Sequence, residues 1–172
     1  SGIDMRDTEE QGTKYNGSGC LIHGLSIIAD SFVAIDCFLK DYPDDAERLL
    51  NALKNNFEGE EELREYLLSC PKFGNNIPEV DNEAAVIANK VSDMLRSKKN
   101  YLGNSFRPDF SSPSTHLLYG YWVGATPDGR KKGEPFAPGA NPMHGREHNG
   151  ALASLNSVSK LPYSSASDGI SN

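Results

Sequence analysis

The sequence is poor in cysteine, and its cysteines do not have the spacing of metal ligands. Cys20, Cys37 and Cys70 are the only three, and no two of them form a CxxC pair. Widely spaced cysteines in an odd number favour free thiols in a reducing compartment over a disulfide framework or a zinc site. We therefore expect no bound metal and a cytoplasmic location.

Long apolar runs and an excess of positive charge are missing as well. Asp30 and Asp36 interrupt the best candidate for a membrane span, so no apolar run reaches the length that a bilayer requires. The first residues also lack the pattern of a signal peptide. With 17 basic and 24 acidic residues the net charge is −7, which argues against a surface for nucleic acid.

The length of 172 residues fits one domain or part of a larger one. The chain opens with a polar stretch over residues 1–12 that has no apolar period and no initiator methionine. We interpret this opening as a sign that the chain belongs to a longer protein, although Ser1 and Gly2 could equally come from cloning.

Apolar periodicity predicts four helices before residue 100. The strongest pattern covers residues 21–39, and its apolar face is broad enough for a largely buried helix. Two shorter amphipathic helices begin near Pro43 and Glu60, each with acidic residues at its positive end. A fourth helix covers about residues 80–98. Residues 100–115 are expected to be an irregular loop, and a loop of that length is usually functional.

The polar residues of the long helix are expected to be structural. Asp30 falls in the middle of the predicted helix, where Asp has a poor propensity, so its side chain should bond a neighbour. We favour an ion pair or a cap over catalysis for this residue. Cys37 is expected in the core. Cys20 lies in a glycine-rich context and is the one candidate for a reactive thiol, but we assign it no catalytic role.

The C-terminal half predicts a strand, a glycine-rich and proline-rich loop, and a helix. Residues 117–123 form its most apolar run and are rich in aromatic and β-branched side chains, which favours a strand. Pro127-Asp128-Gly129 then supplies a turn, because Pro presets φ, Asp bonds nearby backbone and Gly accepts a positive φ. The helix is expected within residues 150–162.

These motifs together resemble the C-terminal part of the glycyl radical enzymes. The most specific are residues 124–135, which contain GATPDGR and GEP, and residues 139–146, which read GANPMHGR. The second block looks most like the pyruvate formate-lyase branch of the family. PKFGNN at residues 71–76 also resembles a family pattern, and residues 12–19 resemble a segment of the diol dehydratase branch. The resemblance covers nearly all of the chain from about Gly12 onward.

The resemblance implies an α/β, helix-rich fold that forms part of a ten-stranded β/α barrel. Residues 1–172 would then be a partial pyruvate formate-lyase-like domain, a fragment of the larger barrel. Thr115, His116 and Phe106 would lie in segments that surround the substrate, and we treat them as substrate-pocket candidates. His116 could bind or orient substrate because it titrates near neutrality, but we favour a histidine satisfied by backbone carbonyls.

Five residues of the family motifs are expected to be structural: Asp128, Gly129, Arg130, His144 and Arg146. For Arg130 the alternative is an anion-binding role toward a carboxylate or the phosphates of coenzyme A. We favour the structural role, because turn chemistry explains the triplet without a ligand. We assign no catalytic residue and no metal ligand within this chain.

The resemblance also implies radical chemistry. Such enzymes store an unpaired electron on a backbone glycine, which takes hydrogen from a cysteine thiol, and the thiyl radical attacks the substrate. This sequence has no adjacent cysteine pair, no cysteine followed two places on by an acid, and no glycine loop of the Arg-Val-Ser-Gly-Tyr type. We therefore expect this chain alone to be inactive and to bind no cofactor, with the glycyl radical outside it in the complete enzyme.

Three functions stay open from the sequence. The first is a segment of a formate C-acetyltransferase, which converts pyruvate and coenzyme A to acetyl-coenzyme A and formate. The second is a glycyl radical diol dehydratase or another carbon–heteroatom lyase. The third is a non-catalytic piece that acts only through its surfaces. As partners we expect the rest of the barrel, a radical S-adenosylmethionine activating enzyme and a second copy in a homodimer, but neither nucleic acid nor a membrane.

Overall fold

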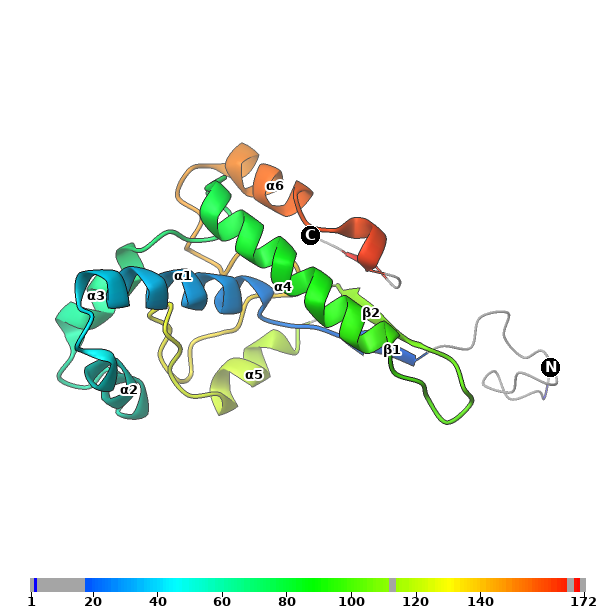
Figure 1. The fold of residues 1–172 in the computed structure, drawn as a ribbon, viewed down its shortest axis with the longest axis horizontal. Helices are drawn as coiled ribbons and strands as arrows, with labels where there is room; N and C mark the ends of the chain where they lie inside the picture. Colours follow the sequence, from blue (N-terminus) through cyan, green and yellow to red (C-terminus); the bar gives the residue numbers. More distant parts are fainter. Residues whose placement is uncertain (1, 3–17, 112–113, 167–168, 171–172) are drawn as a thin grey trace.

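A computed structural model describes residue 2 and residues 18–111, 114–166 and 169–170. Its elements follow one another as β1 (Ser18–Leu21), α1 (Leu25–Asp41), α2 (Ala46–Lys54), α3 (Glu61–Ser69), α4 (Pro78–Arg96), β2 (Phe106–Phe110), α5 (His116–Trp122), α6 (Ala151–Ser159), the 3₁₀ helix η1 (Tyr163–Ser165) and β3 (Gly169–Ile170). The molecule is elongated, with the strands toward one end and α2 and α3 at the other (Figure 1). The segment at residues 12–19 that resembles the diol dehydratase branch falls mostly outside the described residues.

The three strands form one parallel sheet in the order β1, β2, β3. Ser18 lies opposite Phe106 and Leu21 opposite Asp109, while Asp109 also lies opposite Gly169 in β3. Helices α1 to α4 make up the connection from β1 to β2, which is the crossover that parallel strands require. The α/β, helix-rich class is confirmed. The ten-stranded barrel stays a prediction, because only a small parallel sheet is present in the described residues.

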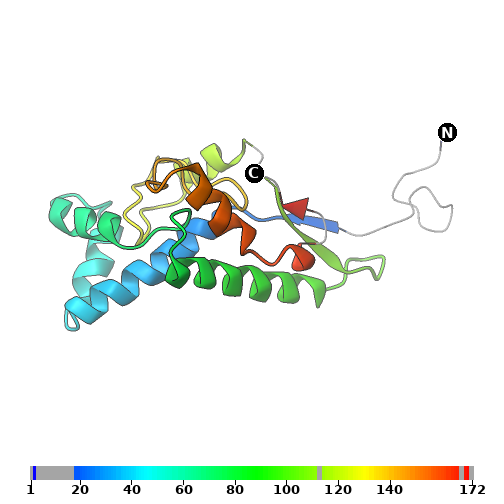
Figure 2. The same ribbon diagram turned by 90° about the horizontal axis from the view of Figure 1, so that it is seen from above.

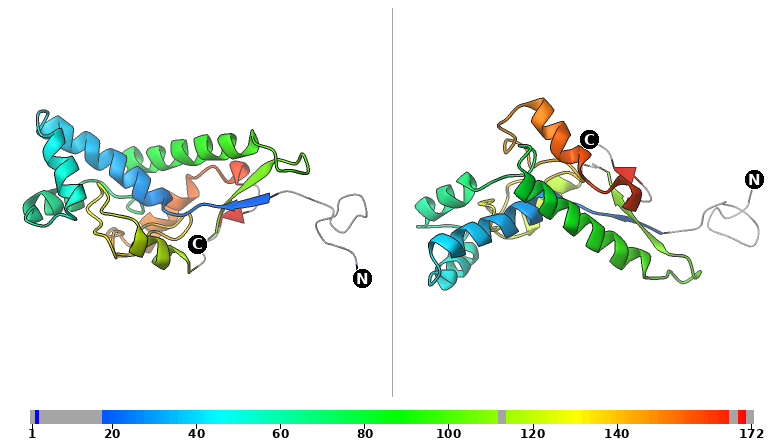
Figure 3. Two further views of the ribbon diagram at one scale, coloured as in Figure 1. Left: turned by 90° about the horizontal axis from the view of Figure 1, so that it is seen from below. Right: turned by 45° about the horizontal axis from the view of Figure 1, so that its top comes forward.

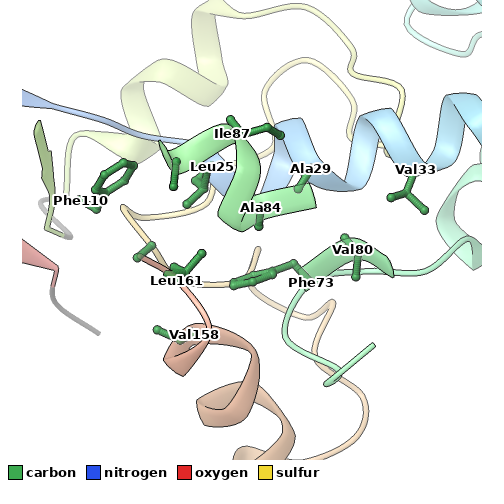
Figure 4. Packing of buried hydrophobic residues seen from close by; sticks show 12 residues of the cluster. Leu25, Ala29, Val33, Phe73, Val80, Ala84, Ile87, Phe110, Val158 and Leu161 are labelled. Carbon is green, nitrogen blue, oxygen red and sulfur yellow. The ribbon is translucent and has the colours of Figure 1, made fainter. Parts of the chain in front are cut away.

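The core lies where α1 and α4 cross and pack against each other beside β2 (Figures 1 and 2). Its buried side chains come from α1, the loop before α4, α4, β2 and the C-terminal segment, and Figure 4 shows them converging: Leu25, Ala29, Val33, Phe73, Val80, Ala84, Ile87, Phe110, Val158 and Leu161. A second cluster joins the far half of α1 to α2 and α3, and partly buried Cys37 packs against it as expected. Burial of such side chains contributes about 1.5–3 kcal/mol each.

The predicted helices are confirmed with shifted ends. The first begins at Leu25 instead of Leu21, because residues 18–21 pair with β2 and Gly24, with φ +78°, turns the chain into the helix. The fourth covers Pro78–Arg96, since Pro78 suits the first turn of a helix. No helix in the described part of the chain is long and apolar enough to cross a membrane.

Two predictions about the region around residue 115 are wrong. Phe106–Phe110 is a central strand within the stretch that was expected to be an irregular loop. His116–Trp122 is the helix α5 within the stretch that was expected to be a strand. A short, uniformly apolar run has no visible period, so the sequence alone does not separate a strand from a helix there. Gly120 lets the helix approach residue 134 closely, since a Cβ at Gly120 would lie 2.2 Å from the Glu134 carbonyl oxygen.

Gly139 lies close to the backbone at the end of β2, and a substitution there tests this close approach. A Cβ added at Gly139, with φ +49°, would lie 2.3 Å from the Phe110 oxygen and 2.4 Å from the Ser111 oxygen. Gly145 has φ +79° but open space around it. We expect Gly145→Ala to cost about 1–2 kcal/mol through its positive φ and Gly139→Ala to cost at least about 2 kcal/mol more. Urea unfolding of both variants measures the difference, and equal losses would contradict the close approach.

Candidate functional site

The N-terminal end of α5 opens onto a cavity of about 450 Å³. It is lined by α5, the residue 135–147 segment and α6: His116, Leu117, Pro135, Phe136, Pro138, Asn141, Pro142, His144, Glu147 and Ser154. The lining combines apolar side chains with two imidazoles, an amide and a carboxylate. That composition is typical of a small-molecule pocket, in which a few polar groups orient a ligand within apolar walls.

The structure separates the three substrate-pocket candidates. His116 lines the cavity, whereas Thr115 and Phe106 are not part of the lining. The Thr115 hydroxyl lies 3.3 Å from Nε2 of His23, and the His23 ring packs against Tyr119 at a tilt of 45°, with centroids 5.1 Å apart. Burial lowers the pKa of His23, and the neighbouring His116 lowers it further. Phe106 lies at the start of β2, one strand length away from Phe110.

The Asp128-Gly129-Arg130 turn lies in the interior of the protein. Gly129 has φ +94°, and a Cβ there would lie 2.8 Å from the Leu68 side chain. The Thr126 hydroxyl donates to Oδ1 of Asp128 at 2.5 Å, and the Arg130 amide donates to the same oxygen at 3.4 Å. Arg64 donates to the Gly129 carbonyl at 2.9 Å, so α3 holds the turn from outside. The chain therefore folds back on itself at this position.

Arg130 is fully buried, and its guanidinium donates to five backbone carbonyl groups. These carbonyls belong to Gly120, Val123, Gly124, Lys131 and Glu134. The guanidinium carbon also lies 4.6 Å from the centre of the Phe136 ring, as in a cation–π contact. The partners of the guanidinium in these hydrogen bonds are all groups of the protein itself. This geometry supports a structural role for Arg130 over binding of an external anion.

Arg146 links the same turn to the C-terminal segment. It donates from Nη1 to the Asp128 carbonyl at 3.0 Å, and its Nη2 lies 3.7 Å from Oδ2 of Asp128. Burial raises the pKa of Asp128, while the Thr126 hydrogen bond and the Arg146 charge oppose that rise. His144 is exposed and lines the cavity, so it lies apart from the buried Asp128, Arg130 and Arg146.

Two further buried ionisable side chains, Asp30 and Lys72, influence each other and Asp128 electrostatically. Oδ1 of Asp30 accepts a hydrogen bond of 2.7 Å from the Phe73 amide, which gives the expected structural contact in the middle of α1. Nζ of Lys72 donates to the carbonyls of Leu67 at 2.6 Å and Cys70 at 2.9 Å. Burial raises the pKa of Asp30 to about 8, and the Phe73 hydrogen bond and the Lys72 charge oppose that rise.

The sequence reasoning missed two polar residues, Lys72, which bonds the nearby carbonyls of Leu67 and Cys70, and Asn75, which joins distant segments. Both are buried, and Asn75 bonds residues 146–149. The one signal was the PKFGNN pattern at residues 71–76, which resembles a family pattern. Among the described residues, no group of three or more His, Cys, Asp and Glu side chains could hold a metal ion.

The raised pKa of Asp30 predicts a stability that falls as the pH rises. The folded state keeps the Asp30 proton up to about pH 8, whereas the unfolded state loses it near 3.8. Folding therefore loses free energy progressively between these two values. Asp30→Asn keeps an oxygen for the Phe73 amide but cannot ionise. We expect the melting temperature of the wild type to fall relative to this variant from pH 5 to pH 9.

The control for this experiment is Asp44→Asn, which changes an exposed carboxylate. Its difference from the wild type should stay nearly constant over the same pH range. A difference between Asp30→Asn and the wild type that does not change with pH would contradict a neutral Asp30 in the folded protein.

Comparisons with known proteins agree with these motifs. The Pyruvate formate lyase-like family model matches residues 3–120, and the Glycine radical family model matches residues 136–172. Formate acetyltransferase 1 of Escherichia coli (strain K12) is 41% identical over 152 residues, which is 88% of this chain and 19% of that protein. The chain thus spans about a fifth of the length of this relative.

Two solved structures resemble the fold closely. The B12-independent glycerol dehydratase of Clostridium butyricum gives a TM-score of 0.84 at 38% identity, over 92% of this chain and 20% of that one. A structure on 1,2-propanediol dehydration in Roseburia inulinivorans gives a TM-score of 0.86 at 34% identity, over 94% of this chain and 21% of that one. By the family model that matches most of its residues and by these relatives, the chain belongs to the pyruvate formate-lyase-like glycyl radical enzymes.

Proposed function

We propose that this chain is a segment of a formate C-acetyltransferase, the glycyl radical enzyme that converts pyruvate and coenzyme A to acetyl-coenzyme A and formate. The observation that carries the proposal is the 41% identity with a formate acetyltransferase across 88% of the chain. The GANPMHGR block at residues 139–146, which looks most like pyruvate formate-lyase, supports the same activity.

A second candidate is a glycyl radical diol dehydratase or another carbon–heteroatom lyase. The similarity to a glycerol dehydratase, at 38% identity and a TM-score of 0.84, favours it almost as strongly. The two identities, 41% and 38%, are nearly equal, so the substrate is decided by product analysis and not by similarity. A non-catalytic role through the surfaces of the chain is the third candidate.

We propose that the complete protein closes a β/α barrel around these residues. The exposed apolar side chains of α5 support a covering partner: Leu117, Leu118, Tyr119, Tyr121 and Trp122 are each 44% or more exposed. An apolar surface of this kind marks a contact with other protein. A cytoplasmic homodimer that is activated by a radical S-adenosylmethionine enzyme belongs to the same proposal. The glycyl radical would then reside outside this chain.

Within this chain, His116 is the residue that we propose for the substrate pocket. It lines the cavity beside α5 with His144 and Asn141. Thr115 would act through His23, whose ring nitrogen lies 3.3 Å from the Thr115 hydroxyl. Phe106 is the first residue of β2, and His116 follows the opposite end of that strand. A contact of Phe106 with the same substrate therefore requires a pocket that reaches along β2.

Product analysis of the full-length protein separates the candidates. The protein would be activated without oxygen by an activating enzyme and S-adenosylmethionine, then given pyruvate with coenzyme A, glycerol or 1,2-propanediol. Formate from pyruvate supports the acetyltransferase. An aldehyde from a diol would contradict the acetyltransferase and support the dehydratase. The chain of 172 residues is the control, and we expect no product from it because it lacks the cysteine and glycine loops.

Arg130→Lys tests whether this residue is structural in the complete enzyme. Lysine cannot reach five carbonyls with its three donors, so buried acceptors would lose their partners. We expect a loss of about 3 kcal/mol in stability and Michaelis constants for pyruvate and coenzyme A that stay within twofold.

The matched control is Arg48→Lys, since the Arg48 side chain is 43% exposed and pairs with Glu60 on the surface. It should change neither stability nor kinetics by much. A tenfold rise in either Michaelis constant for Arg130→Lys, at an unaltered melting temperature, would make Arg130 a binding residue instead.

A further inference from the structure

One short loop makes many of the polar contacts between the two parts of the chain that match different family models. Residues 72–76 belong to the part matched as pyruvate formate lyase-like, and they contact residues 146–160 of the part matched as glycine radical. Figure 3 shows α6 next to the first turns of α4, with this loop directly before α4. Gly74, with φ +93°, brings the loop so close to Pro142 that a Cβ would lie 2.4 Å from its ring.

Asn75 uses its whole side chain in this contact. Nδ2 donates to the carbonyls of Arg146 at 2.8 Å and Lys72 at 3.1 Å. Oδ1 accepts from the amides of His148 at 2.7 Å and Asn149 at 3.0 Å. The Asn75 carbonyl also accepts from the Asn149 side chain at 3.1 Å. Both N–H groups of this buried side-chain amide donate, and its oxygen accepts two hydrogen bonds. Such an amide fixes both the position and the direction of the segment that it bonds.

The segment held by Asn75 has almost no apolar anchor of its own. Between Met143 and Ser157, Arg146 is the one buried residue, while Leu152 and Leu155 are 73% and 58% exposed. Apolar packing resumes only at Val158 and Leu161, which meet Phe73 in the core (Figure 4). The start of α6 is therefore placed by polar contacts and not by burial of apolar surface.

Further polar contacts complete the clamp on α6. The Asn76 amide donates to the Ser157 hydroxyl at 2.9 Å. Nζ of Lys160 donates to Oδ1 of Asn76 at 2.8 Å and to Oδ2 of the buried Asp81 at 2.7 Å. Asp81 is on α4 and Lys160 directly follows α6. The contacts thus tie both ends of α6 to the first turn of α4 and the loop before it.

We infer that Asn75 is a positioning residue that seats the glycine radical part of the enzyme on the pyruvate formate lyase-like part. The inference rests on the proposed function only where it extends to the radical. Since hydrogen bonds hold residues 146–156 in place, loosening them lets this segment move without unfolding the α1–α4 core. A glycine radical carried by this part of the complete enzyme would then be less well shielded.

The test uses hydrogen–deuterium exchange on the full-length protein before activation. Asn75→Ala should speed amide exchange in residues 146–156 by about tenfold or more, because several bonds are lost at once. Asn149→Ala removes one exposed partner and should give a smaller increase at the same place, with little risk to folding. Exchange in α1 and α4 should not change.

Asn51→Asp on the exposed face of α2 is the control, and it should leave exchange in residues 146–156 as in the wild type. Unchanged exchange there in both test variants would overturn the inference. An increase that spreads equally over α1 and α4 would also overturn it, because it would indicate general destabilisation.

A second readout follows the radical in activated protein. We expect the glycine-centred signal of Asn75→Asp, which accepts but cannot donate, to decay several times faster than that of the wild type or Asn51→Asp. A decay equal to the wild type would overturn the link to the radical. A wild type that forms no radical signal would count against the proposed function, while the exchange experiment would still decide the role of Asn75.

Discussion

The rest of this structure depends on the burial of one positive charge. The Arg130 guanidinium is removed from water and donates to five backbone carbonyls, which include the end of α5 and the residue 131–134 loop. One of these carbonyls, that of Gly120, lies in the last turn of α5, and the other four lie outside helices and strands, where no regular ladder satisfies them. A buried carbonyl without a partner costs free energy, so one side chain makes a glycine-rich and proline-rich segment rigid.

This constraint organises the site because the segment lies between the two family-matched parts of the chain, residues 3–120 and 136–172. Arg146 bonds the Asp128 carbonyl from the second part, and Asn75 bonds the Arg146 carbonyl from the first. Apolar packing at Phe73, Val158 and Leu161 supports the same junction. The cavity beside α5 is formed largely by the segment that these polar contacts hold in place.

The sequence predicts the parts of this structure that depend on local pattern. The helices α1 and α4 have a clear apolar period, and the Asp128-Gly129 turn has its own chemistry. It does not predict α5, because a seven-residue apolar run fits a strand as well as a helix. It also missed β2, where Pro108 falls within a central strand. The contact between Asn75 and Arg146 joins residues 71 positions apart, which no local pattern indicates.

The most direct measurement of the central claim is native-state amide exchange within residues 124–135. The Thr126 amide donates to the Arg130 carbonyl at 2.9 Å, the Gly129 amide to Thr126 at 3.0 Å and the Gly133 amide to Gly120 at 3.0 Å. If the buried guanidinium fixes this segment, these three amides exchange as slowly as those in the middle of α1. Exchange at the rate of an exposed loop would contradict the account, because the irregular segment would then open independently of the core.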